Sequence, residues 1–297
     1  MDPIKRSHFI NAVYVVQLLG PQDQQTGEIL FRETLVPAAK SSGLLVRFAN
    51  LASDADLVPA LYAIAEQCAR EGMSPVLHLE SHANSTGVGM SAPKVSWAQL
   101  RPALVAINTA TKLNLLVTMA ACYGAYLIRT IDPTLPTPLW GLVGPAEQVV
   151  ETDVLLGFRA FYRTLALTLD LNAAIDALRA TPLTLPDAWA VYTTELIFAL
   201  AYGHYLATFA NPAGRRAAEL KVLKASRRRN PGQPRPAGLR ASIRRQVEGE
   251  LNFVDKFRRQ FFMIDRFPDN EARFPISVDD CKTLYELHRA GIPNSAA

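Results

Sequence analysis

Two short stretches in the first half of the chain could together form an active site. Residues 76–82 (VLHLESH) are an apolar run that ends on His82, and residues 113–124 (LNLLVTMAACYG) deliver Cys122 just before a glycine. In an open α/β sheet, ligands bind beyond the carboxyl ends of the strands, which is where a side chain at a strand end lies. A cysteine becomes a reactive thiolate when a base or a positive charge is near, and a histidine on the neighbouring strand supplies both. The pattern therefore predicts a thiol and an imidazole that share one pocket.

The segments around these stretches alternate between strand-like and helix-like patterns, which predicts an α/β fold with an open, mostly parallel sheet flanked by helices. Six strands are expected, over residues 10–19, 44–48, 75–81, 113–121, 137–143 and 188–193. Helices are expected over residues 54–70, 96–109, 147–169, 172–180 and 195–210. Two further helical segments, residues 239–267 and 277–290, follow near the end of the chain.

Composition places the chain among ordinary globular proteins, with 297 residues, 49% hydrophobic and 20% charged. Its three cysteines (Cys68, Cys122 and Cys281) are odd in number and far apart, so we expect no disulfide framework and a reducing, cytoplasmic setting. The first residues are polar and predict no signal peptide. The most apolar stretch, residues 196–209, is too short to span a membrane.

Positive charge is concentrated in one part of the chain. Residues 213–259 hold fourteen Lys and Arg against four Asp and Glu, a balance of +10, whereas the whole chain carries +4. Residues 227–238 are rich in Pro, Gly and Arg, which predicts an extended, exposed linker. We therefore expect a catalytic domain over residues 1–210, a basic linker over 211–238 and a helical, basic C-terminal extension over 239–297.

The role of this basic segment stays open at the level of sequence. It is a solvated positive face, a docking surface for a protein partner, or a nucleic-acid contact in which residues 227–229 and 244–245 bind phosphates. The aromatic residues Phe253, Phe257, Phe261 and Phe262 are expected to pack rather than to bind. No helix-turn-helix, zinc-finger or RNA-recognition signature accompanies the charge.

The two motifs resemble those of the caspase-like cysteine peptidases, the clan that includes caspases, gingipains, separase and CHAT domains. In that clan one strand ends in a His-Gly motif and the next ends in Ala-Cys; here residues 80–83 read ESHA and residues 120–124 read AACYG. Four later segments resemble those of the CHAT branch: residues 138–143 (PLWGLV), 158–165 (FRAFYRTL), 173–179 (AAIDALR) and 186–192 (PDAWAVY). The resemblance covers residues 10–193.

This resemblance implies a cysteine endopeptidase that cleaves a specific protein substrate, with a bacterial defence or cell-death role and a regulatory protein partner that activates it. Cys122 would be the nucleophile and His82 the proton-transfer partner, with no third catalytic residue required. The backbone N–H groups of Ala83 and Cys122 would hold the oxyanion. Ala83 departs from the family, which has glycine here; alanine keeps the N–H but tolerates fewer backbone conformations. No cofactor is implied, and no CxxC pair favours zinc.

Other residues near the motifs admit two interpretations. Glu147, Glu151 and Asp153 are candidates for binding an Arg or Lys side chain of the substrate, or they simply favour a helix N-terminus. His78 and His204 are expected to be core histidines, and Glu80 lies on the same strand face as His82. The alternative function is a catalytically silent interaction module that recruits a protein or nucleic-acid partner through its basic tail.

Overall fold

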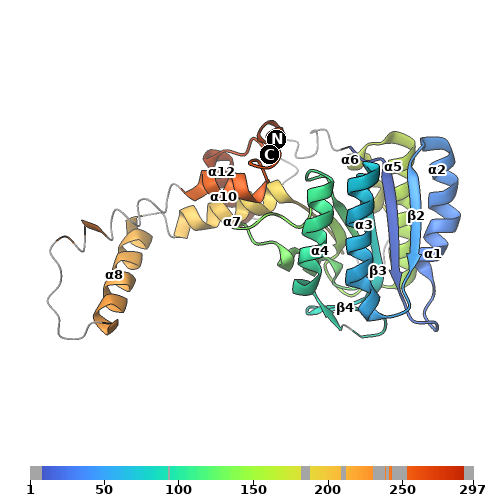
Figure 1. Ribbon diagram of the computed structural model, residues 1–297, viewed down its shortest axis with the longest axis horizontal. Coiled ribbons are helices and arrows are strands. Elements are labelled where there is room, and N and C mark those ends of the chain that lie inside the picture. The colour runs from blue at the N-terminus through green and yellow to red at the C-terminus, as the bar shows by residue number, and fades with distance from the viewer. Residues whose placement is uncertain are drawn as a thin grey trace. The chain divides into compact units, whose positions relative to one another are not determined.

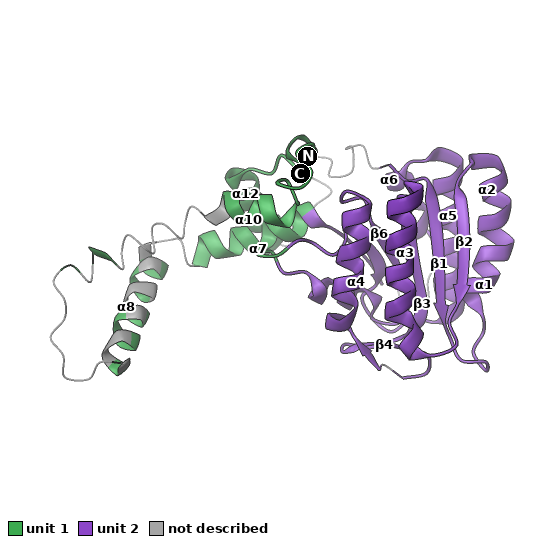
Figure 2. Ribbon diagram, viewed as in Figure 1, with its two compact units in different colours: residues 1–2, 133–135, 195–297 green, residues 3–132, 136–194 purple. Residues whose placement is uncertain are grey.

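The computed structural model describes residues 9–92, 94–181, 188–208, 212–229, 238, 241–242 and 253–290. The chain divides into two compact units (Figure 2). The first, called the sheet unit below, holds residues 3–132 and 136–194, and the second, called the helical unit, holds residues 195–297 with residues 1–2 and 133–135.

One sheet organises the sheet unit (Figure 1). Its main strands lie in the order β2-β1-β3-β6-β7-β8. These strands are β1 (Ala12–Leu18), β2 (Leu45–Asn50), β3 (Pro75–Ala83), β6 (Leu116–Ala120), β7 (Gly141–Pro145) and β8 (Trp189–Thr193). Neighbours pair in parallel except β8, which runs antiparallel to β7. A short hairpin of β4 (Gly87–Gly89) and β5 (Val95–Ser96) follows β3. The predicted α/β class, an open and mostly parallel sheet flanked by helices, is confirmed.

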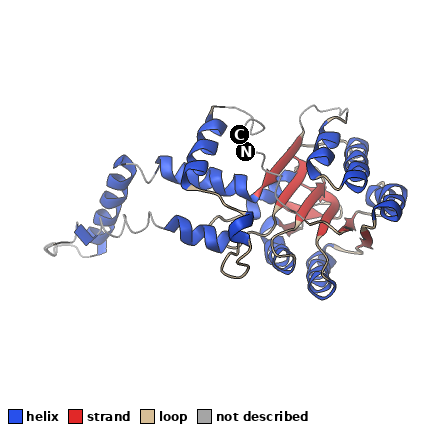
Figure 3. Cartoon of the chain, turned by 90° about the horizontal axis from the view of Figure 1, so that it is seen from above, coloured by secondary structure: helices blue, strands red, loops and turns tan. Residues whose placement is uncertain are grey.

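Helices cover both faces of this sheet (Figure 3). Those of the sheet unit are α1 (Thr26–Leu30), α2 (Val36–Ser42), α3 (Leu57–Glu71), α4 (Trp97–Ala110), α5 (Glu151–Thr168) and α6 (Leu171–Arg179). Helices α3 and α4 pack on one face, where apolar side chains at helical spacing join a single core with the strands. On α3 these include Leu61 and Ile64, and on α4 Leu104 and Ile107, all nearly inaccessible to solvent. Burying one such side chain stabilises the fold by about 1.5–3 kcal/mol.

The opposite face of the sheet is covered by α1, α2 and α5. The segment between β1 and β2 forms α1, a π-helical turn (Phe31–Leu35) and α2 in direct succession. These helices were not predicted from the sequence. Pro37 lies near the start of α2 and has no N–H to donate to the π-helical turn that precedes it.

The helical unit contains α7 (Thr194–Thr208), α8 (Pro212–Arg229), α10 (Phe253–Phe261), α11 (Asn270–Arg273) and α12 (Val278–Arg289). Its core is aromatic: Phe198 of α7 lies 5.3 Å, ring centre to ring centre, from both Phe261 and Phe262, and Phe262 stacks on Phe274 at 4.9 Å. This agrees with the expectation that Phe261 and Phe262 pack; Phe253 has no described side chain.

Helices α7 and α12 approach closely at Gly203. A Cβ atom at this position would lie 2.4 Å from the Cβ of Tyr285, so the crossing requires glycine. The neighbouring His204 is exposed and is hydrogen-bonded to the Tyr285 hydroxyl at 3.0 Å, so the prediction of a core histidine was wrong for His204. The apolar character of α7 comes from its other face.

Residues 212–229 form α8, although the sequence analysis assigned them to a linker, extended from residue 227 onward. The correction has a local cause, because this stretch is rich in Ala, Leu, Lys and Arg, which are strong helix formers. In the sequence, Pro231 and Gly232 follow one residue after its end, and both are poor helix formers. The rest of the predicted linker lies largely outside the described residues. Among the described helices, none is both long and apolar enough to cross a bilayer.

Candidate active site

The pairing of β3 with β6 brings the two predicted residues to one edge of the sheet. The strands run parallel, and their last pair is Glu80 opposite Ala120. His82 and Cys122 each follow this pair by two residues, so they occupy matching positions beyond it. Both lie at the carboxyl ends of their strands, where an open α/β sheet binds its ligands.

The imidazole of His82 is held by a carboxylate that the sequence analysis did not identify. Its Nε2 lies 3.0 Å from Oδ2 of Asp23, and the same oxygen accepts the N–H of Gly20 at 2.7 Å. The His82 side chain is 46% exposed. Among the described residues no hydrogen bond engages its Nδ1, so this nitrogen remains available for a reacting group. A carboxylate on one ring nitrogen fixes the tautomer and orientation of a histidine.

Hydrogen bonds from Gln17 and Gln25 stabilise the loop that carries Asp23. The side-chain amide of Gln25 donates to the carbonyl groups of Gly20 and Asp23, each at 2.9 Å. Its own oxygen accepts from Nε2 of the buried Gln17 on β1 at 2.7 Å. This loop follows β1, which is the neighbour of β3 in the sheet. Asp23 could have been identified as a carboxylate in the loop after β1. That inference would have required knowing that β1 lies beside β3.

Cys122 lies on a sharp turn after β6. The next residue, Tyr123, has φ of 56° and a left-handed conformation, which costs a non-glycine residue about 1–2 kcal/mol. Gly124 follows because a Cβ atom there would lie 2.6 Å from the Cβ of Met119. The Cys-Tyr-Gly sequence thus forms a turn that lifts the cysteine out of the sheet, and a 3₁₀ helix (Gly124–Thr130) continues the chain.

The loop between β7 and α5 passes beside this cysteine. The Cys122 thiol is 3.6 Å from the carbonyl oxygen of Val149, and the N–H of Tyr123 donates to the carbonyl of Glu147 at 2.9 Å. Helix α5 begins at Glu151 rather than at Glu147 as predicted, because the carbonyl groups of Glu147 and Val149 accept from the cysteine turn instead of from a following helical turn. Two of the acidic candidates are therefore helical and one is not.

The three acidic candidates for substrate binding lie in different settings. Glu147 is an exposed loop residue whose backbone contacts the residue after Cys122. Glu151 and Asp153 belong to the first turn of α5, where carboxylates interact favourably with the helix dipole. Glu147 is thus the candidate whose backbone is joined to the cysteine turn.

The other two cysteines are buried and unsuited to nucleophilic chemistry. Cys68 and Cys281 are each 1% exposed. Burial raises the pKa of the Cys68 thiol to about 11 and that of Cys281 to about 12, so both stay protonated at neutral pH. Cys122 is partly exposed and is the accessible thiol of the three.

The backbone N–H of Ala83 is not used by the adjoining strand. The N–H of Asn84 donates to the carbonyl of Gly87 at 3.0 Å, so the next pair, Ala83 with Val88, is a non-hydrogen-bonded pair. In agreement, the carbonyl of Val88 accepts from Lys94 instead. Ala83 is extended within β3, so alanine in place of the family's glycine introduces no left-handed strain.

A buried polar cluster lies on the face of β3 that α5 covers. His78 is fully buried, with Nδ1 2.9 Å from the Thr118 hydroxyl and 3.2 Å from that of Tyr162, and Nε2 3.1 Å from Oε2 of Glu80. The Thr26 hydroxyl donates to the other oxygen of Glu80. His78 is therefore the core histidine that was predicted.

The Glu80 carboxylate belongs to this buried cluster and not to the His82 site. Its carboxylate is committed to His78 and Thr26, whereas His82 is bound by Asp23. Burial raises the pKa of Tyr162, which keeps that phenol protonated within the cluster. No group of three or more His, Cys, Asp or Glu side chains in the described parts of the chain could hold a metal ion.

Comparison with known proteins gives a structural likeness but no match in sequence. No protein-family model matches this chain, and no curated protein matches its sequence. Among solved structures the chain is similar to caspase-1 from Spodoptera frugiperda, with 12% identity and a TM-score of 0.46, over 64% of this chain and 89% of that one. A likeness of this extent assigns no function.

Proposed function

We propose that this protein is a cysteine endopeptidase in which Cys122 is the nucleophile and His82 transfers protons. One observation carries the proposal: the in-register pairing of β3 and β6 delivers an accessible thiol and a carboxylate-bound imidazole to the same sheet edge. The ESHA and AACYG motifs, which resemble those of caspase-like peptidases, support it independently.

The reaction would follow the usual course of thiol proteases. The Cys122 thiolate attacks the carbonyl carbon of the scissile peptide, and the carbonyl electrons move onto oxygen. His82 protonates the amine as the C–N bond breaks, which leaves a thioester on Cys122. His82 then removes a proton from water, which attacks the thioester and releases the acid product and the free thiol.

Backbone donors would stabilise the charge that develops on the carbonyl oxygen. The N–H of Ala83 is left unused by β4, and the N–H of Cys122 lies at the same edge. One such donor contributes about 2.7–4 kcal/mol to transition-state stabilisation in other proteases. Because the donors belong to the backbone, the change from glycine to Ala83 leaves them intact.

Asp23 would act as a positioning residue for His82. With Nε2–H bound to the carboxylate, Nδ1 is the nitrogen that exchanges protons with the sulfur and the substrate. The proposed site therefore differs from the dyad expected from the resemblance by this third side chain.

The substrate would be a protein with an Arg or Lys beside the scissile bond. Glu147 is exposed on the loop that contacts the cysteine turn, with Glu151 and Asp153 at the start of the following helix. An activating protein partner and a defence or cell-death role belong to the same proposal, on the family resemblance alone.

A peptide-library digest tests this function. Tryptic and Glu-C peptides of a whole proteome are incubated with the protein, and new termini are identified by mass spectrometry. We expect cleavages that require Cys122, with Arg or Lys enriched before the cut among the Glu-C peptides. The Glu147→Gln variant should lose that enrichment while it keeps cleaving. Enrichment of acidic residues would refute the specificity, and wild-type termini identical to those of Cys122→Ala, even after activation, would favour the silent interaction module.

The Asp23→Asn variant separates positioning from loop structure. Because one Asp23 oxygen makes both contacts, an asparagine oxygen in its place can still accept the Gly20 N–H and face Nε2 of His82, but the variant removes the negative charge that stabilises a protonated imidazole. We expect alkylation of Cys122 by a peptidyl acyloxymethyl ketone to slow by about 10- to 100-fold. The matched control is Asp56→Asn, an exposed carboxylate bonded to Ser53, which should alkylate at the wild-type rate. Wild-type kinetics in Asp23→Asn would leave Asp23 as a brace of the loop only.

A further inference from the structure

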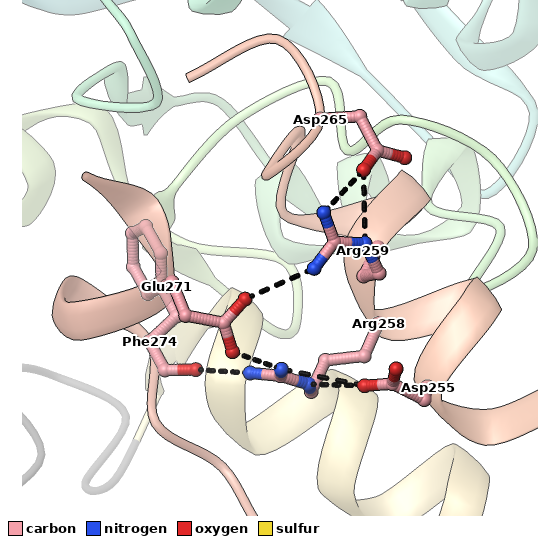
Figure 4. Close-up of polar contacts among 6 residues, drawn as sticks. All are labelled: Asp255, Arg258, Arg259, Asp265, Glu271 and Phe274. Carbon is pink, nitrogen blue, oxygen red and sulfur yellow. Dashed lines mark hydrogen bonds and ion pairs between the residues drawn. The ribbon is translucent and has the colours of Figure 1, made fainter. Parts of the chain in front are cut away.

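The structure divides the basic segment of the chain into two parts of different character. In α10, Arg258 binds the carboxylates of Asp255 and Glu271 and the carbonyl of Phe274, and its neighbour Arg259 binds Asp265 and Glu271 (Figure 4). Two of these contacts are close, with Arg259 2.5 and 2.9 Å from one oxygen of Asp265.

The positive charges of these two arginines are neutralised by carboxylates within the helical unit. Three carboxylates surround two guanidinium groups, and the contacts join α10 to residues 265–274, which follow it in the chain (Figure 4). Such a network holds local structure together and leaves no net positive charge to offer a partner. Positive charge available for binding must therefore come from elsewhere in the segment.

Helix α8 differs from α10 in this respect. It has four exposed cationic side chains that form no ion pair with any carboxylate in the described part of the chain: Arg216, Lys221, Lys224 and Arg228. By sequence, residues 212–229 hold seven Lys and Arg against one acidic residue, Glu219. Among the residues that the structure describes, this helix thus gathers exposed positive charge that no described carboxylate neutralises.

The distribution of charged and aromatic residues on α8 indicates which class of partner it can bind. Its charged residues recur all around the helix, so it lacks the continuous apolar face of helices that lie in a membrane surface or insert into an apolar groove. It contains no Phe, Tyr or Trp, the side chains on which single-stranded bases stack. Eighteen helical residues extend over about 27 Å, along which a duplex presents a phosphate every 1.7 Å or so.

We propose that α8 binds the phosphate backbone of a double-stranded nucleic acid without sequence preference. Arginine and lysine neutralise phosphates and release bound counterions, which accounts for most non-specific affinity. The cations of α8 supply this contact, and its lack of aromatic side chains favours the duplex over a single strand. This inference does not rest on the peptidase proposal, and it adds a second partner class to the molecule.

The test is titration of a fluorescein-labelled 20-base-pair DNA duplex of mixed sequence with the full chain, followed by anisotropy at 50–200 mM NaCl. The α8 variant combines R216Q, K221Q, K224Q and R228Q, since glutamine is a good helix former. We expect it to bind at least about tenfold more weakly at 100 mM salt. The salt dependence of log K should become shallower by up to about 0.9 for each cation removed.

A control variant removes the same charge from other exposed sites, with K40Q, R163Q, R179Q and K282Q. It should bind the duplex like the wild type. An equal loss of duplex affinity in both variants would show that net charge alone explains the binding, which would contradict a site on α8. Unchanged affinity in the α8 variant would also overturn the proposal. So would tighter binding to poly-glutamate or to phosphatidylserine vesicles than to the duplex. Alkylation of Cys122, measured in parallel, reports on the catalytic site separately.

Discussion

Replacement of Cys122 by alanine is expected to reduce peptide cleavage by at least about 1000-fold and to abolish alkylation by a peptidyl acyloxymethyl ketone. The reason is that Cys122 is the one accessible thiol among the three cysteines, and the proposed covalent step uses its sulfur. Intact-mass spectrometry before and after exposure to the reagent measures the adduct, and peptide mapping locates it.

The two buried cysteines are the matched controls for this result. Cys68→Ala and Cys281→Ala should each keep one adduct on Cys122. Below about pH 9 the native protein should be alkylated nowhere else, because burial raises the pKa of Cys68 to about 11 and that of Cys281 to about 12. An adduct on Cys68 or Cys281 in the folded protein, with Cys122 unmodified, would contradict the assignment.

Replacement of Glu80 by alanine is expected to lower the free energy of unfolding by about 2–5 kcal/mol. The carboxylate accepts hydrogen bonds from the buried His78 ring and from Thr26, and each buried group left without a partner costs about 1–3 kcal/mol. Urea denaturation followed by circular dichroism measures the change.

A surface carboxylate provides the comparison. Glu33 pairs with Arg159 but its side chain is 62% exposed, so Glu33→Ala should change the unfolding free energy by less than about 1 kcal/mol. A double-mutant cycle of Glu80→Ala with Thr26→Val should show strong coupling. If Glu80→Ala were as mild as Glu33→Ala, the polar cluster would not contribute to the stability of the sheet unit.

The parts of the fold that sequence predicted are those with strong local patterns. The apolar strands that carry His82 and Cys122 were placed to within a few residues, because buried parallel strands read as continuous apolar runs. Helix α4 began where expected, since Ser96 and Gln99 form a capping box at its start. The fold class followed from the alternation of such segments.

The parts that sequence missed depend on contacts between distant residues. Asp23 lies 59 positions before His82, and only the adjacency of β1 and β3 brings them together. The direction of β8 was not predicted, because an apolar run carries no information on parallel or antiparallel pairing. The division between paired arginines in α10 and the four α8 cations that have no described carboxylate partner likewise requires the folded chain.

The most direct test of the account is a crystal structure of the protein alkylated by a peptidyl acyloxymethyl ketone. We expect a thioether to the Cys122 sulfur, with Nδ1 of His82 facing the modified carbon and Nε2 on Asp23. The inhibitor oxygen should lie near the N–H of Ala83 or Cys122. An imidazole turned to the other side of the sheet, or one beyond contact with the bound peptide, would contradict it.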